Sequence, residues 1–160
     1  MTKMQTVISG RRYRMRAFFQ VLSVLAFSAL SAAAAESARV ASVVDGDTVR
    51  LVIEGQREVS VRVLDLNTPE TKRCGREDRI MSDCEPCPAG VGLGRRARAE
   101  ARRILPAGSI VTVATRGRDR YGRVLGAITL PDGRDYRTVI IAAGLGVRYP
   151  KGKRPRPWCE

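Results

Sequence analysis

The chain has 160 residues, of which 44% are hydrophobic and 5% aromatic, so it is long enough for one domain with a mainly aliphatic core and is not of the disordered class. Its formal net charge of +13 favours a polyanionic partner, although solubility or an anionic membrane surface would explain the charge equally well. The absence of histidine excludes the nuclease and protease mechanisms that use one, and leaves acid–base chemistry to carboxylates, Lys, Tyr, Arg or a metal-bound water.

The N-terminal segment has the pattern of a secretory signal peptide. A basic stretch at residues 11–16 precedes an almost wholly apolar run at residues 17–35, which ends in consecutive alanines. We expect cleavage after this run and a periplasmic or secreted bacterial protein. A retained membrane anchor is the alternative, because the run is just long enough to cross a bilayer. The chain therefore divides into a signal peptide at residues 1–35, a domain at 36–150 and a basic, proline-rich tail at 151–160 that ends in Trp-Cys-Glu.

The first part of the domain is predicted to be a meander of strands joined by tight turns. Its segments alternate polar and apolar residues and are separated by the turn signals Asp-Gly-Asp and Glu-Gly. The predicted strands are residues 39–44, 48–53 and 58–64. A long, polar, irregular loop follows at residues 68–88. Compact domains rarely keep a loop of this length without a use for it.

The second part is predicted to contain a helix at residues 94–105, then strands at residues 109–115 and 123–130, and then a short helix at residues 136–143. The end of the chain, from residue 149, is expected to be extended. Five strands with one helix between the third and fourth, and a short helix after the fifth, are the order of a five-stranded OB-fold barrel. The predicted class is mainly β with helices (α+β). Barrels of this kind commonly bind oligonucleotides.

The cysteines are even in number, which in an exported protein indicates disulfides. They are Cys74, Cys84, Cys87 and Cys159. Four cysteines allow three pairings. A zinc site is the alternative, because Cys84-x-x-Cys87 has the spacing of metal ligands, but no second pair completes such a site.

Four positions carry more polar chemistry than the predicted turns and strands require. They are residues 45–48 (DGDT), Arg62 in its strand, residues 67–71 (NTPET) and residues 119–123 (DRYGR). Taken singly, each has an ordinary explanation as a hairpin turn, an interstrand ion pair or a helix N-cap. Together they offer oxygen ligands for a hard cation and permanently charged donors for phosphate oxygens, the groups that phosphodiester cleavage requires.

Together these four positions lie in three motifs, in the order VVDGDTV, VRVLDLNTPETK and DRYGRVLGAI, that closely resemble the staphylococcal nuclease-like (thermonuclease) family. The likeness runs from about Arg39 to Tyr149. It implies a five-stranded OB-type barrel and a calcium-dependent endonuclease that acts on DNA and RNA. It also implies attack by water on phosphorus, release of the 5′-oxygen and retention of a 3′-phosphate. We expect a monomer with no stable protein partner.

The resemblance also implies a calcium site and a phosphate grip on the residues that match the family's motifs. Asp47 looks like the metal-ligating aspartate, Asn67 stands at a second ligand position, and Thr68 looks like the ligand that offers its backbone carbonyl. Glu70 resembles the carboxylate that positions or deprotonates the attacking water. The groups that resemble substrate contacts are Arg62 and Arg123 for the phosphate, and Arg120, Tyr121 and Tyr149 for the nucleotide.

Asn67 departs from the family pattern, which has an aspartate at this position. An amide still offers an oxygen, but one anionic ligand fewer is expected to weaken calcium binding. Asp65 lies two residues earlier and is a candidate substitute. At the end of the chain, a disulfide is expected to tie Cys159 back to the loop. The preferred pairing is Cys87–Cys159 with Cys74–Cys84.

Two other functions are compatible with these features. The first is a non-catalytic OB module that binds nucleic acid and has lost its metal through Asn67. The second is an envelope protein whose basic tail contacts anionic lipid or polymer. Retention of Arg62, Glu70 and Arg123 together favours the enzyme, because a mere binding module has no need for all three.

Overall fold

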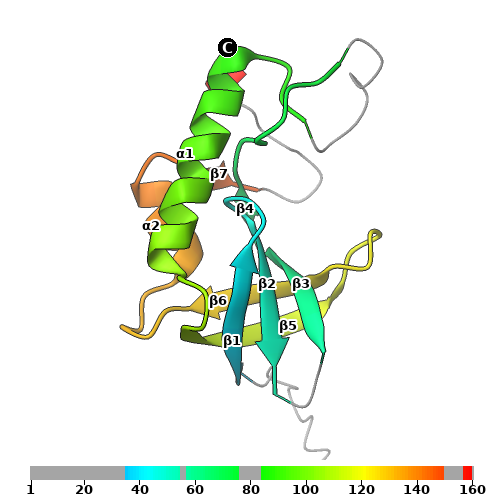
Figure 1. Cartoon of the computed structure of the whole chain (residues 1–160), viewed down its shortest axis with the longest axis vertical. Coiled ribbons are helices and arrows are strands. Elements are labelled where there is room, and N and C mark those ends of the chain that lie inside the picture. Colours follow the sequence, from blue (N-terminus) through cyan, green and yellow to red (C-terminus); the bar gives the residue numbers. More distant parts are fainter. Residues whose placement is uncertain (1–34, 55–56, 76–83, 150–156, 160) are drawn as a thin grey trace, which may run out of the picture. The chain divides into compact units, whose positions relative to one another are not determined.

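The computed structural model describes residues 35–54, 57–75, 84–149 and 157–159, which are coloured in Figure 1. The predicted signal peptide lies outside the described residues except for Ala35, and so do residues 151–156 of the predicted tail. No helix in the described part of the chain is both long and apolar enough to cross a membrane.

Five strands close into a barrel in the order β1-β2-β3-β6-β5 (Figure 1). Their bounds are Ala35–Val43 for β1, Thr48–Ile53 for β2, Glu58–Val63 for β3, Ile110–Arg118 for β5 and Val124–Thr129 for β6. Neighbouring strands are antiparallel except β3 and β6, which are parallel. This is the order of the predicted OB-fold barrel, and the α+β class is confirmed.

The interior of the barrel is aliphatic, as the low aromatic content predicts. Alternate side chains of a strand point to the same face, so the pattern of β2 and β3 sends valine and leucine inward. Val49, Leu51 and Val61 are fully buried, and Val113 of β5 meets them from the far side of the barrel. Burial of such side chains stabilises the fold by about 1.5–3 kcal/mol each.

Tyr136 is the exception to this aliphatic core, since it is fully buried and yet carries a hydroxyl. The hydroxyl donates a hydrogen bond to the Gly46 carbonyl oxygen at 2.9 Å. Burial raises the pKa of Tyr136, and the negative charge of Asp45 adds to the effect, so the hydroxyl keeps the proton that this bond requires. The bond ties the second helix to the turn between β1 and β2.

The long helix α1 comprises Pro88–Ile104 and so begins before its predicted start at residue 94. Its N-cap is Cys87, whose Sγ accepts a hydrogen bond from the Gly90 N–H at 3.2 Å. The glycines of its first two turns lower the helix propensity of this end, which is why the sequence pattern predicts too short a helix. The second helix, α2, comprises Tyr136–Ala142 and ends one residue before the prediction.

The strands β1 and β5 are longer than predicted. β1 begins at Ala35 rather than residue 39, and β5 ends at Arg118 rather than residue 115. Ala35 pairs with Ala114, and Arg39 pairs with Ile110, so the two strands hydrogen-bond along the seam that closes the barrel. This pairing joins distant parts of the chain, and a local pattern contains no record of it.

Three short elements and two disulfides complete the described structure. The short elements are β4 (Leu66–Asn67), β7 (Val147–Arg148), which pairs with β4, and the 3₁₀ turn η2 (Pro157–Cys159), which contacts α1. At residues 157–159 this 3₁₀ turn replaces the extended conformation predicted from residue 149, while residues 150–156 and 160 lie outside the described residues. The disulfides are Cys74–Cys84 and Cys87–Cys159, which is the pairing preferred from the sequence.

Candidate functional site

Asp47 and Arg62 form a buried ion pair at one end of the barrel. The register of β2 and β3 places Thr48 opposite Arg62, which brings the guanidinium to the residue before Thr48. Arg62 Nη1 pairs with Asp47 Oδ1 and also donates to the Asp47 carbonyl oxygen at 3.2 Å. The two side chains are only 11% and 5% exposed. The guanidinium carbon of Arg62 lies 5.9 Å from the centre of the Tyr149 ring, which limits its freedom further.

The Asp47 carboxylate also holds the predicted ligand segment. Its Oδ2 accepts a hydrogen bond from the Thr68 N–H at 2.9 Å. Asn67 and Thr68 are almost fully buried, and Asn67 pairs with Val147 in the small β4–β7 sheet. The structure therefore brings the three predicted metal ligands, Asp47, Asn67 and Thr68, into one region.

Two glycines allow neighbouring segments to close on this region. A Cβ atom at Gly46 would lie 2.8 Å from the side chain of Thr68, and one at Gly146 would lie 3.0 Å from the Asn67 carbonyl oxygen. Any other residue would push the ligand segment away from the turn or from β7. The sequence pattern treats Gly46 as an ordinary turn residue and assigns no role to Gly146, so it contains no signal of this packing.

Glu70 is half-buried, and its backbone is held from two sides. A Cβ atom at Gly94 would lie 2.3 Å from the Glu70 carbonyl oxygen, so α1 packs directly on this loop. The Glu70 N–H donates a hydrogen bond to Glu85 Oε1 at 2.9 Å. Sequence reasoning missed Glu85, although an acidic residue between Cys84 and Cys87 was a signal that could have been followed.

Arg123 is arranged like Arg62, with an aspartate on one side and a tyrosine ring on the other. Its Nε pairs with Asp119 Oδ2 at 2.7 Å, and its guanidinium carbon lies 5.5 Å from the centre of the Tyr121 ring. Burial acts to raise the pKa of Asp119, but hydrogen bonds from Arg123 and from the backbone outweigh it and leave that pKa below its ordinary value. Arg120 donates from Nη2 to the Tyr121 hydroxyl at 2.8 Å. Tyr121 is 59% exposed, so this end of the site is open to solvent.

Asp45 lies in the turn before β2. Burial raises the pKa of Asp45 above its ordinary value, while the charge of Arg62, hydrogen bonds from Thr48 and the charge of Arg123 oppose the rise. The parallel pairing of β3 with β6 aligns Arg62 with Leu125, two residues after Arg123, so the two arginines lie on adjacent segments. Sequence reasoning selected Asp47 from the Asp-Gly-Asp turn and missed the part played by Asp45.

The oxygen donors of the predicted metal site suit a hard divalent cation. They are the Asp47 carboxylate, the Asn67 amide oxygen and the Thr68 carbonyl oxygen. In the ranges that the structure describes, no group of three or more acidic, cysteine or histidine side chains is gathered to hold a metal ion. Asp65 does not supply the missing carboxylate, since it is 61% exposed and pairs with Arg137 at 3.3 Å. With one carboxylate, this set of donors has fewer negative charges than a tight site for such a cation.

The chain resembles one known protein family and two bacterial proteins. The family of staphylococcal nuclease homologues matches residues 60–156. The chain is 32% identical over 111 residues to an "Uncharacterized endonuclease" of Escherichia coli and to one of Escherichia coli O157:H7. The aligned part is 69% of this chain and 60% of each relative, so the chain spans about three fifths of the length of these curated relatives.

The family match contains Arg62, Glu70 and Arg123, and it begins after Asp47. It covers more than half of the chain, and the barrel has the expected strand order. The chain belongs to the family of staphylococcal nuclease homologues.

Proposed function

We propose that this protein is an exported, calcium-dependent endonuclease that hydrolyses phosphodiester bonds of DNA and RNA and leaves 3′-phosphate ends. The family and the two endonuclease relatives support the reaction class. The observation that carries the proposal is that the pairing of β3 with β6 brings Arg62 and Arg123 onto adjacent segments, beside the buried Asp47 and the Glu70 loop.

The two arginines are suited to grip the phosphate. Each guanidinium is planar and permanently charged, and can give two parallel hydrogen bonds to phosphate oxygens. Arg62 and Arg123 are already oriented by ion pairs and tyrosine rings, so little conformational freedom remains to be lost when substrate binds. Charge that builds on the phosphate oxygens in the transition state meets donors that are already in place.

Glu70 is the group that would orient or deprotonate the attacking water. It is half-buried on a loop whose backbone is fixed by Gly94 and Glu85, which suits a carboxylate that has to hold one position. Asp47, Asn67 and Thr68 would hold the calcium ion, which when bound would neutralise charge and acidify water.

Export is part of the same proposal. The apolar run at residues 17–35 supports a signal peptide. The two disulfides fit an oxidising compartment, because reducing compartments keep cysteine thiols in the reduced form.

Asn67 favours one alternative, a nucleic-acid-binding barrel without catalysis. An amide in place of the carboxylate lowers the negative charge available to a cation. This alternative predicts binding of nucleic acid that is unaffected by calcium, and no cleavage.

A nuclease assay separates the two functions. The purified, oxidised protein is incubated with plasmid DNA and with RNA, first in calcium and then with a chelator. We expect degradation that needs calcium, falls by about 100- to 1000-fold in Glu70→Gln and persists in Glu100→Gln, which removes a partly exposed carboxylate of α1 that pairs with Arg103. Product ends that resist polymerase extension until a phosphatase is added would identify 3′-phosphates. Binding without cleavage at every calcium concentration would refute the proposal.

Asn67→Asp tests the metal site separately. Restoring the carboxylate is expected to tighten calcium binding roughly tenfold, because one more anionic oxygen faces the cation. Calcium titration by calorimetry measures the change. An unchanged affinity would show that residue 67 does not bind the metal.

A further inference from the structure

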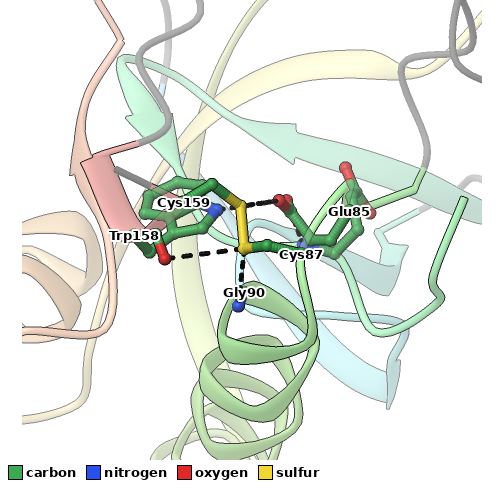
Figure 2. The surroundings of a disulfide bond; sticks show 6 residues. Glu85, Cys87, Gly90, Trp158 and Cys159 are labelled. Atoms are coloured by element: carbon green, nitrogen blue, oxygen red, sulfur yellow. Dashed lines mark hydrogen bonds between the residues drawn. A yellow bond between two sulfur atoms is a disulfide. The ribbon is translucent and has the colours of Figure 1, made fainter.

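Glu85 is a buried carboxylate that the proposed chemistry does not use. It is 1% exposed, although acidic side chains are almost never fully buried without partners. Each of its oxygens meets a donor: Oε1 accepts from the Glu70 N–H at 2.9 Å, and Oε2 accepts from Trp158 Nε1 at 2.8 Å. Figure 2 shows the indole of Trp158 directed at Glu85, beside the disulfide.

The backbone around Glu85 is fixed on both sides. The Glu85 N–H donates to the Lys72 carbonyl oxygen at 2.8 Å, and the Cys74 N–H donates to the Glu85 carbonyl oxygen at 2.9 Å. The Cys74–Cys84 disulfide closes this short ladder immediately before Glu85. The carboxylate is therefore placed by covalent and main-chain contacts, and its own side chain has little freedom.

The second disulfide brings Trp158 to this carboxylate. Cys87, the N-cap of α1, is bonded to Cys159, the residue after Trp158 (Figure 2). A Cβ atom at Gly90 would lie 2.8 Å from Trp158 Cδ1 and 2.9 Å from Glu85 Oε2, so the first turn of α1 leaves room only for glycine there. The indole thus contacts Glu85 in the space left by the absence of a side chain at Gly90.

We infer that Glu85 is a positioning residue for Glu70, and that Trp158, locked by the Cys87–Cys159 disulfide, holds Glu85 in place. Glu85 accepts a hydrogen bond from the backbone N–H of Glu70, and so fixes the position of the main chain from which the Glu70 side chain extends. The inference rests on the proposed function, in which Glu70 orients the attacking water. A misplacement of about 1 Å in such a group lowers the rate by about a hundredfold.

Two variants test the inference, and the first is nearly isosteric. Glu85→Gln keeps the volume but places an NH₂ group against one of two N–H donors. Trp158→Phe removes the indole donor together with part of the ring. We expect kcat to fall by about 10- to 100-fold in Glu85→Gln and less in Trp158→Phe, with KM within about twofold of the unmodified protein. KM is spared because the arginines that grip the substrate lie on the barrel. Glu100→Gln, which changes a partly exposed carboxylate of α1 that pairs with Arg103, is the matched control and leaves kcat unchanged.

A double-mutant cycle distinguishes positioning from mere stability. If Glu85 acts through Glu70, Glu85→Gln has no further effect on the residual rate of the Glu70→Gln protein. A loss of the same factor in both backgrounds would mean that Glu85 only supports folding, and would overturn the inference.

Amide NMR gives a readout that does not need activity. An N–H that donates to a carboxylate resonates downfield, and we expect the Glu70 amide to shift upfield in Glu85→Gln and Trp158→Phe while the Val113 amide in the barrel stays in place. Unmoved Glu70 resonances in both variants would overturn the inference. An unmodified protein that cleaves nothing but shows the predicted shift would overturn the proposed function instead, and leave the Glu85 contact supported.

Discussion

The site is supported from two sides that are built in different ways. On the barrel side, Asp47 immediately precedes β2 and Arg62 lies on β3, two strands whose aliphatic residues form the core. On the side that carries the cysteines, the backbone of Glu70 is held by α1 and by the buried Glu85, which the indole of Trp158 contacts beside a disulfide. The barrel side is stabilised by burial of apolar area, whereas the cysteine side depends on a few polar and covalent contacts.

The two proposed tasks of the site, gripping phosphate and positioning water, belong to these two different sides. The proposed phosphate grip belongs to the barrel, which apolar packing and a closed ladder of hydrogen bonds make rigid. The proposed water-positioning carboxylate belongs to a loop whose described residues contribute nothing to the main apolar core. Disulfides and a satisfied buried carboxylate replace that core, because constraint of the unfolded chain and hydrogen bonds do not require apolar area.

The largest expected effect is on variants of the two arginines, which should lose similar activity but different amounts of stability. Arg62→Ala removes a phosphate donor and leaves Asp47 as an unpaired buried charge, so we expect a loss of about 100- to 1000-fold in kcat/KM and of about 3–5 kcal/mol in unfolding free energy. Arg123→Ala is expected to cost a similar factor in rate with little loss of stability, since the Arg123 side chain is 33% exposed. Kinetics and urea unfolding on both variants measure the contrast. Equal losses of stability would contradict it.

The two disulfides should stabilise the protein by different amounts, because they close loops of different length. Cys87→Ser with Cys159→Ser opens a separation of 72 residues, and Cys74→Ser with Cys84→Ser opens one of 10. On the chain-entropy estimate, the first pair of substitutions lowers the unfolding free energy by about 4 kcal/mol and the second by about 3 kcal/mol. Denaturant unfolding of the oxidised proteins gives both values. A reversed order would show that native contacts near Glu85 outweigh the entropy of the unfolded chain.

Gly94→Ala tests the contact between α1 and the Glu70 loop. The new Cβ atom would lie 2.3 Å from the Glu70 carbonyl oxygen, so the loop has to move, and we expect a rate loss of about 10- to 100-fold with a destabilisation of about 1–3 kcal/mol.

Gly92→Ala is the matched control for this change. It lies on the same helix with no atom within 4 Å of its Cβ position, and is expected to stabilise the protein by up to about 1 kcal/mol with unchanged activity. Equal behaviour of the two variants in kinetics and thermal unfolding would mean that α1 does not fix the loop.

The smallest effect concerns pH and the two aspartates beside the arginines. The folded pKa of Asp45 is raised, so its ionised form opposes folding at neutral pH, and Asp45→Asn should raise the thermal midpoint there. The gain should vanish as pH falls below the ordinary pKa of 3.8, where the carboxyl is protonated in the unfolded chain also. Asp119 has the opposite sign: its pKa is lowered, so the stability it contributes is present at neutral pH and is lost in acid. Thermal scans of Asp45→Asn and Asp119→Asn from pH 3 to pH 7 should therefore diverge in sign, and parallel curves would contradict the assignment.

Much of the fold was predictable because it is recorded in local patterns. Alternation of apolar residues and Gly-containing turns marked each strand of the barrel, and propensity marked the later turns of α1 and all of α2. Apart from the unpredicted β4, β7 and 3₁₀ turn, the failures were at element ends. The start of α1 was hidden by glycines that exist for its contacts with Glu70 and Trp158, and the extra residues of β1 and β5 depend on each other across the seam.

The site divides in the same way. Its motifs named Asp47, Arg62, Glu70 and Arg123, and their catalytic and metal-binding roles stay predictions. The tertiary structure added Asp45, whose pKa is affected by the charges of both arginines, and Glu85, which accepts a hydrogen bond from the Glu70 N–H.

By itself, the sequence determined the barrel, its aliphatic core and the residue types that can bind a phosphate, because strand periodicity and motif chemistry are properties of neighbouring residues. Only the tertiary structure decided what holds those residues in place. Glu85 reaches Glu70 across 15 residues, Trp158 reaches Glu85 across 73, and Tyr136 reaches Gly46 across 90. Contacts over such separations arise when the barrel closes and the disulfides form, and no window of neighbouring residues contains both partners.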